Sequence, residues 1–268
     1  MSNLIPSQTG LTLRRTDTLI SLTNKLLANT GVKGIGEMSD DELWEWWLSL
    51  SDEWKFLLLR QGLGLELWQN DDWEFNKEYD YQADFNWLNR ELVFEYLKEL
   101  QILMEFNLEI NQIQDISGLA NLTQLTELYL TENNIQDITP LTHLMQLRTL
   151  RLSYNQIQNI SALASLTKLT YLDITGNHIQ DISVIKHLIQ LTMLDLCENQ
   201  IQDISALANL TQLTYLDLGH NQIQDISALA NLTQLTTFSL SNNQIQDITP
   251  LANLTQLTEL WLGNNPIQ

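Results

Sequence analysis

Three aspartates, Asp173, Asp195 and Asp217, recur at intervals of 22 residues and form the most suggestive set of chemical groups in the sequence. Carboxylates at a fixed interval can meet a cationic segment of a partner, or can hold a hard metal ion. Ca²⁺ takes about six to eight oxygen ligands, whereas these carboxylates are expected to form a single line. The pattern therefore favours recognition of a Lys- or Arg-containing protein segment, and it predicts neither a metal nor a cofactor.

Catalytic chemistry finds little support in the other reactive side chains. The sequence contains no Gly-rich phosphate loop, no G-x-S-x-G or H-E-x-x-H motif and no Cys/His cluster. The single cysteine, Cys197, has no base one repeat away that would activate its thiol. We therefore interpret it as a small side chain at a repeat position and not as a nucleophile. The four histidines stand at variable positions of the repeat described below. The sequence therefore predicts a protein that is not an enzyme.

Charge narrows the class of partner. The 268 residues include 13 Lys and Arg against 33 Asp and Glu, for a net charge of -20. Such a surface repels phosphate groups, so we expect no binding to nucleic acid or to a membrane surface. One cysteine excludes an intrachain disulfide framework. No secretion signal and no run of eighteen apolar residues is evident, and we therefore expect a soluble, cytoplasmic protein.

An internal repeat supplies the elements that must position these residues. One asparagine column recurs with a period of 22 residues, and its members are Asn111, Asn133, Asn155, Asn177, Asn199, Asn221, Asn243 and Asn265. With Leu103 as position 1 of the first unit, apolar residues occupy positions 1, 4, 6, 11, 14, 17 and 20. Eight such units, the last of them incomplete, cannot fold singly and must stack to bury a shared core.

Each unit combines two periodicities. Positions 1, 4 and 6 indicate a short strand, whereas positions 11, 14, 17 and 20 indicate a tight helical return. Ser or Thr at position 15 is a candidate N-cap for the return, with Pro140 and Pro250 directly after it. Asn at position 9 can satisfy buried backbone groups, and Asp at position 13 is typical of a turn. These features predict an α/β solenoid, with a parallel sheet on the concave side and 3₁₀ or helical returns on the convex side.

The repeats resemble those of the leucine-rich repeat family. The segment NQIQDISALANLTQLT, found at Asn199–Thr214 and again at Asn221–Thr236, is similar to the 22-residue repeats of internalins and of phosphatase regulators. The resemblance covers Leu103–Gln268. It implies a right-handed, curved solenoid that binds a protein partner on its concave face. Internalins carry a secretion signal and a wall anchor, neither of which is evident here, so we expect an intracellular role instead of an adhesin.

The first 102 residues differ in kind and predict a small all-α domain that caps the solenoid formed by 103–268. Seven of the eight tryptophans lie there, at Trp44, Trp46, Trp47, Trp54, Trp68, Trp73 and Trp87. Helices are expected over 19–27, 51–61 and 84–101, and Ser39 with Glu42 predicts a capping box for a helix through Leu48. The tryptophans are interpreted as core residues, although a partner-binding or membrane-interface role is the alternative.

The variable positions of the strand face define the predicted binding site. Positions 3 and 5 point away from the core, and position 8 follows the strand. Tyr and Met would supply anchor area, the aspartates a cation site, and two arginines the opposite charge. The predicted residues are Tyr129, Arg148, Arg151, Tyr154, Tyr171, Asp173, Met193, Asp195, Glu198, Tyr215, Asp217, His220 and Trp261. A merely hydrated face of recently duplicated units is the alternative interpretation.

Two functional hypotheses follow from this pattern. In the first, the chain is a protein-interaction module that grips a basic or mixed-charge partner, as a scaffold or as a sensing or regulatory subunit. In the second, it is a structural or self-assembling solenoid. The second rests on the eighth unit, which stops at Gln268 and leaves an apolar end through which copies could form a homo-oligomer.

Overall fold

The computed structural model describes residues 33–51, 54, 55, 58 and 104–268. The chain divides into two compact units, Met1–Phe106 and Asn107–Gln268, and each is considered by itself. The helices predicted over 19–27 and 84–101 lie outside the described residues, as do Trp68, Trp73 and Trp87.

The described part of the first unit contains a 3₁₀ helix, η1 (Ile35–Glu37), and an α-helix, α2 (Asp40–Ser49). The predicted capping box is confirmed: Ser39 Oγ accepts from the Glu42 N–H at 3.3 Å, and Glu42 Oε2 accepts from the Ser39 N–H at 2.9 Å. The helix ends one residue later than predicted. Lys33 forms an ion pair with Glu42, and this contact together with the Ser39 bonds lowers the pKa of Glu42 to about 2.

Three of the tryptophans described in this unit are buried. Trp46, Trp47 and Trp54 are 8%, 4% and 3% exposed, and Leu43 and Leu58 are buried as well. The Trp54 N–H donates to Ser51 Oγ at 3.3 Å, as at the start of the helix predicted from Ser51. The interpretation of these three tryptophans as core residues is therefore confirmed.

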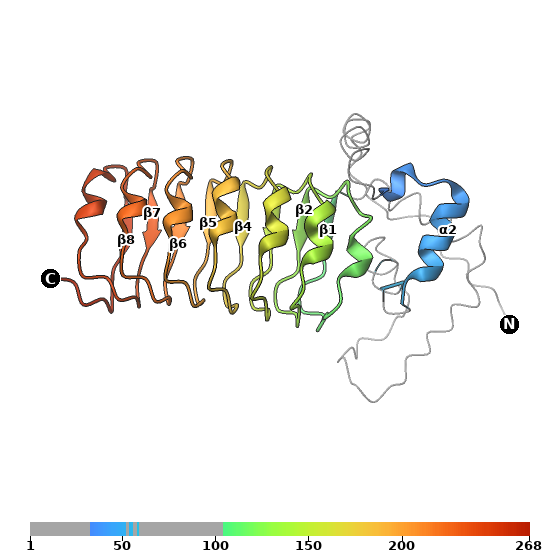
Figure 1. Cartoon of the computed structure of the whole chain (residues 1–268), viewed down its shortest axis with the longest axis horizontal. Helices are drawn as coiled ribbons and strands as arrows, with labels where there is room; N and C mark the ends of the chain where they lie inside the picture. The colour runs from blue at the N-terminus through green and yellow to red at the C-terminus, as the bar shows by residue number, and fades with distance from the viewer. Residues whose placement is uncertain (1–32, 52–53, 56–57, 59–103) are drawn as a thin grey trace, which may run out of the picture. The chain divides into compact units, whose positions relative to one another are not determined.

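The second unit is a solenoid whose coils each contribute one strand to a single parallel sheet (Figure 1). The strands follow one another in chain order. They are β1 (Glu105–Asn107), β2 (Glu127–Tyr129), β3 (Thr149–Arg151), β4 (Tyr171–Asp173), β5 (Met193–Asp195), β6 (Tyr215–Asp217), β7 (Thr237–Ser239) and β8 (Glu259–Trp261). The predicted fold class, a solenoid with a parallel sheet and 3₁₀ returns, is confirmed.

Short 3₁₀ helices form the opposite side of each coil. They are η4 (Ser117–Leu119), η5 (Thr139–His143), η6 (Ser161–Ser165), η7 (Ser183–His187), η8 (Ser205–Leu207), η9 (Ser227–Leu229) and η10 (Thr249–Asn253). The predicted Ser/Thr N-cap is wrong, because position 15 is the first helical residue and makes no side-chain cap. The carboxylate two residues earlier does this work: Asp203 Oδ1 accepts from the Ser205 N–H at 2.8 Å. Asn159 replaces the aspartate before η6 and makes the same bond at 2.9 Å.

The core runs along the interior of the coils. The apolar residues at position 4 in β2 to β6, such as Leu172 and Leu216, and those at position 6 just after these strands are 0% exposed. The asparagine side chains bond to buried backbone groups, as predicted, and so join neighbouring coils. Asn199 Nδ2 donates to the Ile174 carbonyl at 3.0 Å, and its Oδ1 accepts from the Ile179 N–H at 3.0 Å. Each asparagine thus satisfies backbone groups of the preceding coil that would otherwise be buried without a hydrogen-bond partner.

Position 8 carries a feature that the sequence pattern does not reveal. Its backbone is left-handed along the whole solenoid, although only Gly176 among these residues lacks a side chain. A left-handed conformation costs an L-residue about 1–2 kcal/mol. The non-glycine residues of this column are Ile110, Glu132, Tyr154, Glu198, His220, Asn242 and Asn264.

Candidate protein-binding surface

The strand register places the predicted aspartates side by side. Asp173 pairs with Asp195 across β4 and β5, and Asp195 pairs with Asp217 across β5 and β6. Arg151 of β3 pairs with Asp173, so a cation stands at one end of the row. Parallel strands lie about 4.8 Å apart. The middle of the face is therefore a continuous line of one cation and three half-buried carboxylates.

Each of these carboxylates also closes a turn. The Oδ1 atom of each aspartate accepts from the backbone N–H two residues later: from Thr175 at 3.1 Å for Asp173, from Cys197 at 3.1 Å for Asp195, and from Gly219 at 2.7 Å for Asp217. Part of the aspartate column is thus explained by local structure. The charge of the carboxylates is not required for these bonds, since an amide oxygen would accept equally well.

Asp195 has the most constrained carboxylate of the row. Its Oδ1 also accepts from Thr175 Oγ1 at 2.7 Å, and its Oδ2 lies 3.4 Å from the Tyr215 hydroxyl. Burial raises the pKa of Asp195 to about 6, and the charges of Asp217 and Asp173 add to the increase, while the hydrogen bonds oppose it. A cation placed next to this carboxylate would favour its charged form.

Two tyrosines flank Arg151. Its guanidinium lies 5.5 Å from the ring centroid of Tyr129 and 5.2 Å from that of Tyr171, which are cation–π distances. Burial and then Asp173 raise the pKa of Tyr171, whereas Arg151 lowers it. This stacking holds the guanidinium on the strand face at the N-terminal end of the carboxylate row.

Aromatic and apolar side chains occupy the neighbouring column. Tyr171, Met193 and Tyr215 are register partners on β4, β5 and β6, and Met193 is 38% exposed. Burial, followed by the charges of Asp195 and Asp217, raises the pKa of the Tyr215 hydroxyl, which therefore stays protonated. This column can supply desolvated contact area beside the charged row.

The remaining predicted residues lie around this cluster, and the charge of Glu198, then burial and the charges of Cys197, Asp173 and Asp195, raise the pKa of the Tyr154 hydroxyl. Arg148 is exposed one residue before β3, on the edge that leads into the strand. Trp261 is 48% exposed on β8, beyond the polar residues of β7. Tyr154, Glu198 and His220 follow the strands in the left-handed column.

Tyr154 and His220 each contact another residue of the left-handed column. A Cβ atom built on Gly176 would lie 2.6 Å from Cδ1 of Tyr154, so this ring packs directly against the glycine. His220 Nε2 lies 2.9 Å from Asn242 Nδ2. The central cluster thus comprises Tyr129, Arg151, Tyr171, Asp173, Met193, Asp195, Tyr215 and Asp217.

Cys197 has the properties of an unreactive residue. Its thiol is half-buried, and burial together with Asp217 and Asp195 raises its pKa to about 12. The reactive thiolate is therefore scarce at neutral pH.

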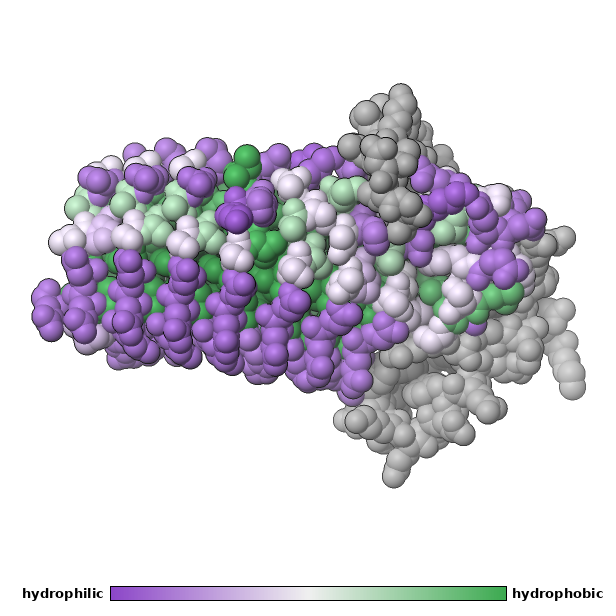
Figure 2. Space-filling model, in the orientation of Figure 1, coloured by the Kyte–Doolittle hydropathy of each residue, from purple (hydrophilic) through white to green (hydrophobic). Residues whose placement is uncertain are grey.

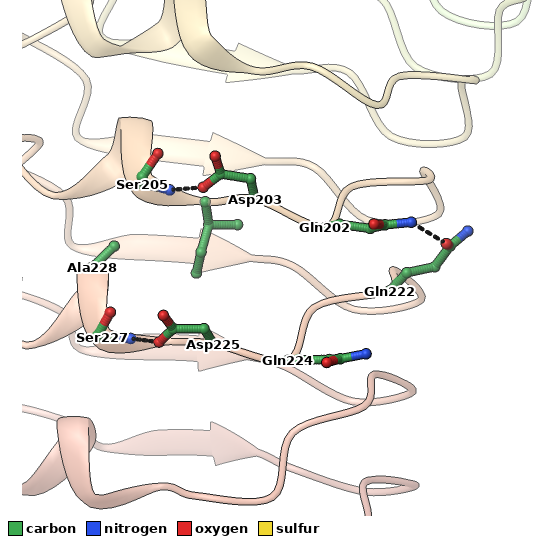
Figure 3. Close-up of a pocket in the computed structure, with 9 residues that line it drawn as sticks. Gln202, Asp203, Ser205, Gln222, Gln224, Asp225, Ser227 and Ala228 are labelled. Atoms are coloured by element: carbon green, nitrogen blue, oxygen red, sulfur yellow. Dashed lines mark hydrogen bonds between the residues drawn. The ribbon is translucent and has the colours of Figure 1, made fainter.

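A shallow groove lies between two neighbouring coils on the other side of the solenoid (Figure 3). Several of its polar atoms have partners within the coils: Asp225 Oδ1 accepts from the Ser227 N–H at 2.8 Å, and Gln202 Nε2 donates to Gln222 Oε1 at 3.0 Å. Hydrophilic residues of this kind stack in columns along one border of the coils (Figure 2). The lining belongs to repeated positions, which points to coil stacking and not to a ligand.

The described residues offer neither a metal site nor a membrane-spanning helix. Within 33–51 and 104–268, with the three isolated described residues between them, no group of His, Cys, Asp and Glu is arranged to hold a metal ion. Among the same residues, no helix is long and apolar enough to cross a bilayer.

Comparison with known families accounts for the repeat. The family described as Leucine Rich repeats (2 copies) matches residues 103–143, 146–187, 189–231 and 233–268, which together make up more than half of the chain. The chain belongs to the leucine-rich repeat family. Leucine-rich repeat proteins commonly mediate protein–protein interaction. A comparison with curated proteins finds no match.

Solved structures place this leucine-rich repeat chain near bacterial internalins. Internalin C2 of Listeria monocytogenes is 40% identical with a TM-score of 0.61, over 64% of this chain and 76% of that one. An internalin (inlF) of the same organism is 41% identical with a TM-score of 0.54, over 64% of this chain and 56% of that one. A Leptospira interrogans leucine-rich repeat protein is 27% identical with a TM-score of 0.61, over 65% and 46% of the two chains. The predicted likeness to internalins is confirmed.

Proposed function

We propose that this leucine-rich repeat protein binds a protein partner through the central cluster of its strand face, and that the bound segment has mixed charge. The observation that carries the proposal is the contiguous register of Arg151, Asp173, Asp195 and Asp217 beside an aromatic column. A partner's acidic group would face Arg151, and its Lys or Arg would face the carboxylates. The role is that of a non-enzymatic scaffold or regulatory subunit.

Repulsion between the neighbouring carboxylates would make the binding of a cation favourable. Like charges on directly adjacent strands disfavour one another, and Asp195 is also partly removed from water. A partner's ammonium or guanidinium group relieves both penalties at once, while Tyr171, Met193 and Tyr215 bury contact area around it. The binding free energy therefore depends on the charge of the row and falls as salt screens it.

Conversion of Asp173, Asp195 and Asp217 to asparagine tests the proposal without disturbing the turns. Asparagine keeps an acceptor for each backbone N–H, as Asn159 does before η6, but removes three negative charges. Asp181→Asn, Asp203→Asn and Asp225→Asn on the opposite side form the matched control, because they change charge equally and keep the same kind of bond.

The measurement is affinity capture from source cells with the parent and both variants. We expect proteins that the parent and the control variant retain and the strand-face variant loses, with binding of each purified protein weakening as salt rises. Equal retention by all three proteins would rule out the carboxylate row as the recognition site.

A second function, self-association, has one observation of its own. Leu260 and Ile267 in the eighth coil are 40% and 36% exposed, whereas Leu216, which occupies the position of Leu260 in β6, is 0% exposed. The apolar end of the stack and the edge strand β8 could pair with a second copy. Sedimentation analysis over a range of concentrations tests this: a mass that stays monomeric excludes the self-assembling solenoid.

A further inference from the structure

Cationic residues gather on one border of the solenoid that the proposed binding face does not use. Residues 104–268 contain fifteen Asp and Glu but only four Lys and Arg, namely Arg148, Arg151, Lys168 and Lys186. Arg151 belongs to the strand face. The other three lie between the end of a 3₁₀ helix and the start of the next strand, or in the last turn of η7.

Apolar side chains accompany these cations. Ile189 follows η7 and is 58% exposed, and Met145 is half-buried at the same repeat position two coils earlier. Lys168 Nζ donates to Gln146 Oε1 at 2.6 Å. This bond holds the ammonium group at Gln146, the residue that follows Met145 in the sequence. We call Met145, Arg148, Lys168, Lys186 and Ile189 the basic edge.

The repeats themselves show that the basic edge is not needed for folding. In the coils that follow, the position of Lys186 is taken by Ala208 and Ala230, and the position of Ile189 by Thr211 and Thr233. Each of these coils also forms a strand and a 3₁₀ helix, although η8 and η9 span three residues where η7 spans five. The basic and apolar substitutions are confined to three neighbouring coils, and they replace small or neutral residues on an exposed border.

Charge balance indicates what the basic edge meets. Among the described residues, no ion pair is formed by Arg148, Lys168 or Lys186, although carboxylates are nearly four times as numerous as cations in this unit. Three cations without carboxylate partners beside an exposed isoleucine are complementary to a segment that carries both acidic and apolar side chains.

We propose that the basic edge is a second docking surface, which binds an acidic segment of a protein partner with an apolar side chain seated against Ile189. The two surfaces then differ in polarity: the carboxylate row takes cations, and the basic edge takes carboxylates. This inference does not rest on the proposed function of the strand face.

The variant Lys168→Gln, Lys186→Ala, Ile189→Thr tests the second surface, because it installs residues that other coils carry at these positions. The control variant Gln234→Glu, Gln256→Glu lowers the net charge by the same two units on the same border, two and three coils beyond the coil of Ile189. Circular dichroism establishes that both fold. The probe is a labelled short peptide of Glu and Leu, titrated with the full-length proteins by fluorescence anisotropy.

We expect the parent and the control to bind the peptide, and the affinity of the basic-edge variant to fall by about tenfold or more. Added salt should weaken binding, and the Asp173, Asp195 and Asp217 asparagine variant should bind the peptide as the parent does. Equal affinity of parent and basic-edge variant, or equal loss in the control, overturns the proposal. So does binding to phosphatidylserine vesicles without binding to the peptide, which would assign the edge to a membrane.

Discussion

At the scale of single residues, the order of the candidate site could be predicted because an unbroken 22-residue period leaves only one way to align the strands. The adjacency of Asp173, Asp195 and Asp217 follows from that period alone. Their second role could not be predicted, since the bond from each carboxylate to the backbone two residues later depends on the conformation of the turn. The same holds for the left-handed column, where seven residues with side chains adopt the conformation that Gly176 adopts.

Asp195 should make stability depend on pH in an unusual direction. Its pKa is about 6 in the folded protein, against about 3.9 in an unfolded chain. Between these values the folded state binds more protons, so stability falls as pH rises from about 4 to about 6 and stays lower above. The Asp195→Asn variant, which keeps the turn acceptor, should be more stable than the parent at pH 7 by about 2–3 kcal/mol.

Urea unfolding of the parent and of the Asp195→Asn variant across this pH range is the measurement. The two proteins should converge in stability near pH 4. Asp203→Asn provides the control, because its carboxylate is exposed beside η8. A difference between parent and Asp195→Asn that does not change with pH would contradict the ascribed burial of the charge.

Gly176→Ala should be destabilising for two separate reasons. Its backbone φ of 64° is unfavourable for any residue with a Cβ, and that atom would meet the Tyr154 ring. We expect a loss of about 1–3 kcal/mol. In the Tyr154→Ala background the loss should shrink toward the cost of the left-handed backbone alone. A double-mutant cycle by chemical denaturation measures this coupling, and strictly additive losses would show that the ring does not oppose the new methyl group.

At the scale of elements, the strands and returns could be predicted from periodicity, but their caps could not. The Ser/Thr column was assigned the capping role because it precedes the apolar return, yet the Asp column two residues earlier holds that role. The reason is geometric: the 3₁₀ helix starts at position 15 itself, so its first N–H needs an acceptor from upstream, such as Asp203 for Ser205.

Asparagine in the middle of the stack should contribute more to stability than asparagine at its end. Asn199 is 8% exposed and makes four hydrogen bonds to backbone groups, whereas Asn265 makes the equivalent bonds in a half-buried setting. Asn199→Ala leaves buried groups unpaired and should cost about 3 kcal/mol or more. Asn265→Ala should cost clearly less, because water can replace the amide.

Thermal and urea denaturation of the two asparagine variants provide the comparison. Each variant is its partner's control, since the substitution and the repeat position are identical. Equal losses at both positions would mean that burial does not determine the cost of the missing bonds.

At the scale of the whole molecule, the solenoid is held together by contacts between neighbouring coils, so its two ends need not be equally stable. The eighth coil exposes apolar residues that are buried elsewhere, and its β8 has a partner on one side only. Helix α2 could be predicted from the capping box of Ser39 and Glu42, because this signal is local, as the signals of the repeats are.

Truncation of leucines at matched strand positions should reveal this gradient. Leu216→Ala removes a fully buried side chain and should cost about 2–5 kcal/mol, whereas Leu260→Ala removes one that is 40% exposed and should cost about 1 kcal/mol. Hydrogen exchange should correspondingly show amides of β8 opening before those of β6. Equal protection of the two strands in dilute solution would indicate that another molecule covers the end.

The side-chain hydrogen bonds between coils join nearest neighbours only, and this affects how the gene can gain or lose repeats. The asparagine, aspartate and glutamine bonds of one coil are repeated 22 residues later, so a duplication or deletion of one 22-residue unit would create no new kind of junction. Duplication of the unit that carries β4 would add a fourth aspartate to the row and lengthen it by the width of one strand, about 4.8 Å. Unequal crossing-over could thus re-space the charges that a partner meets in discrete steps, and leave the fold unchanged.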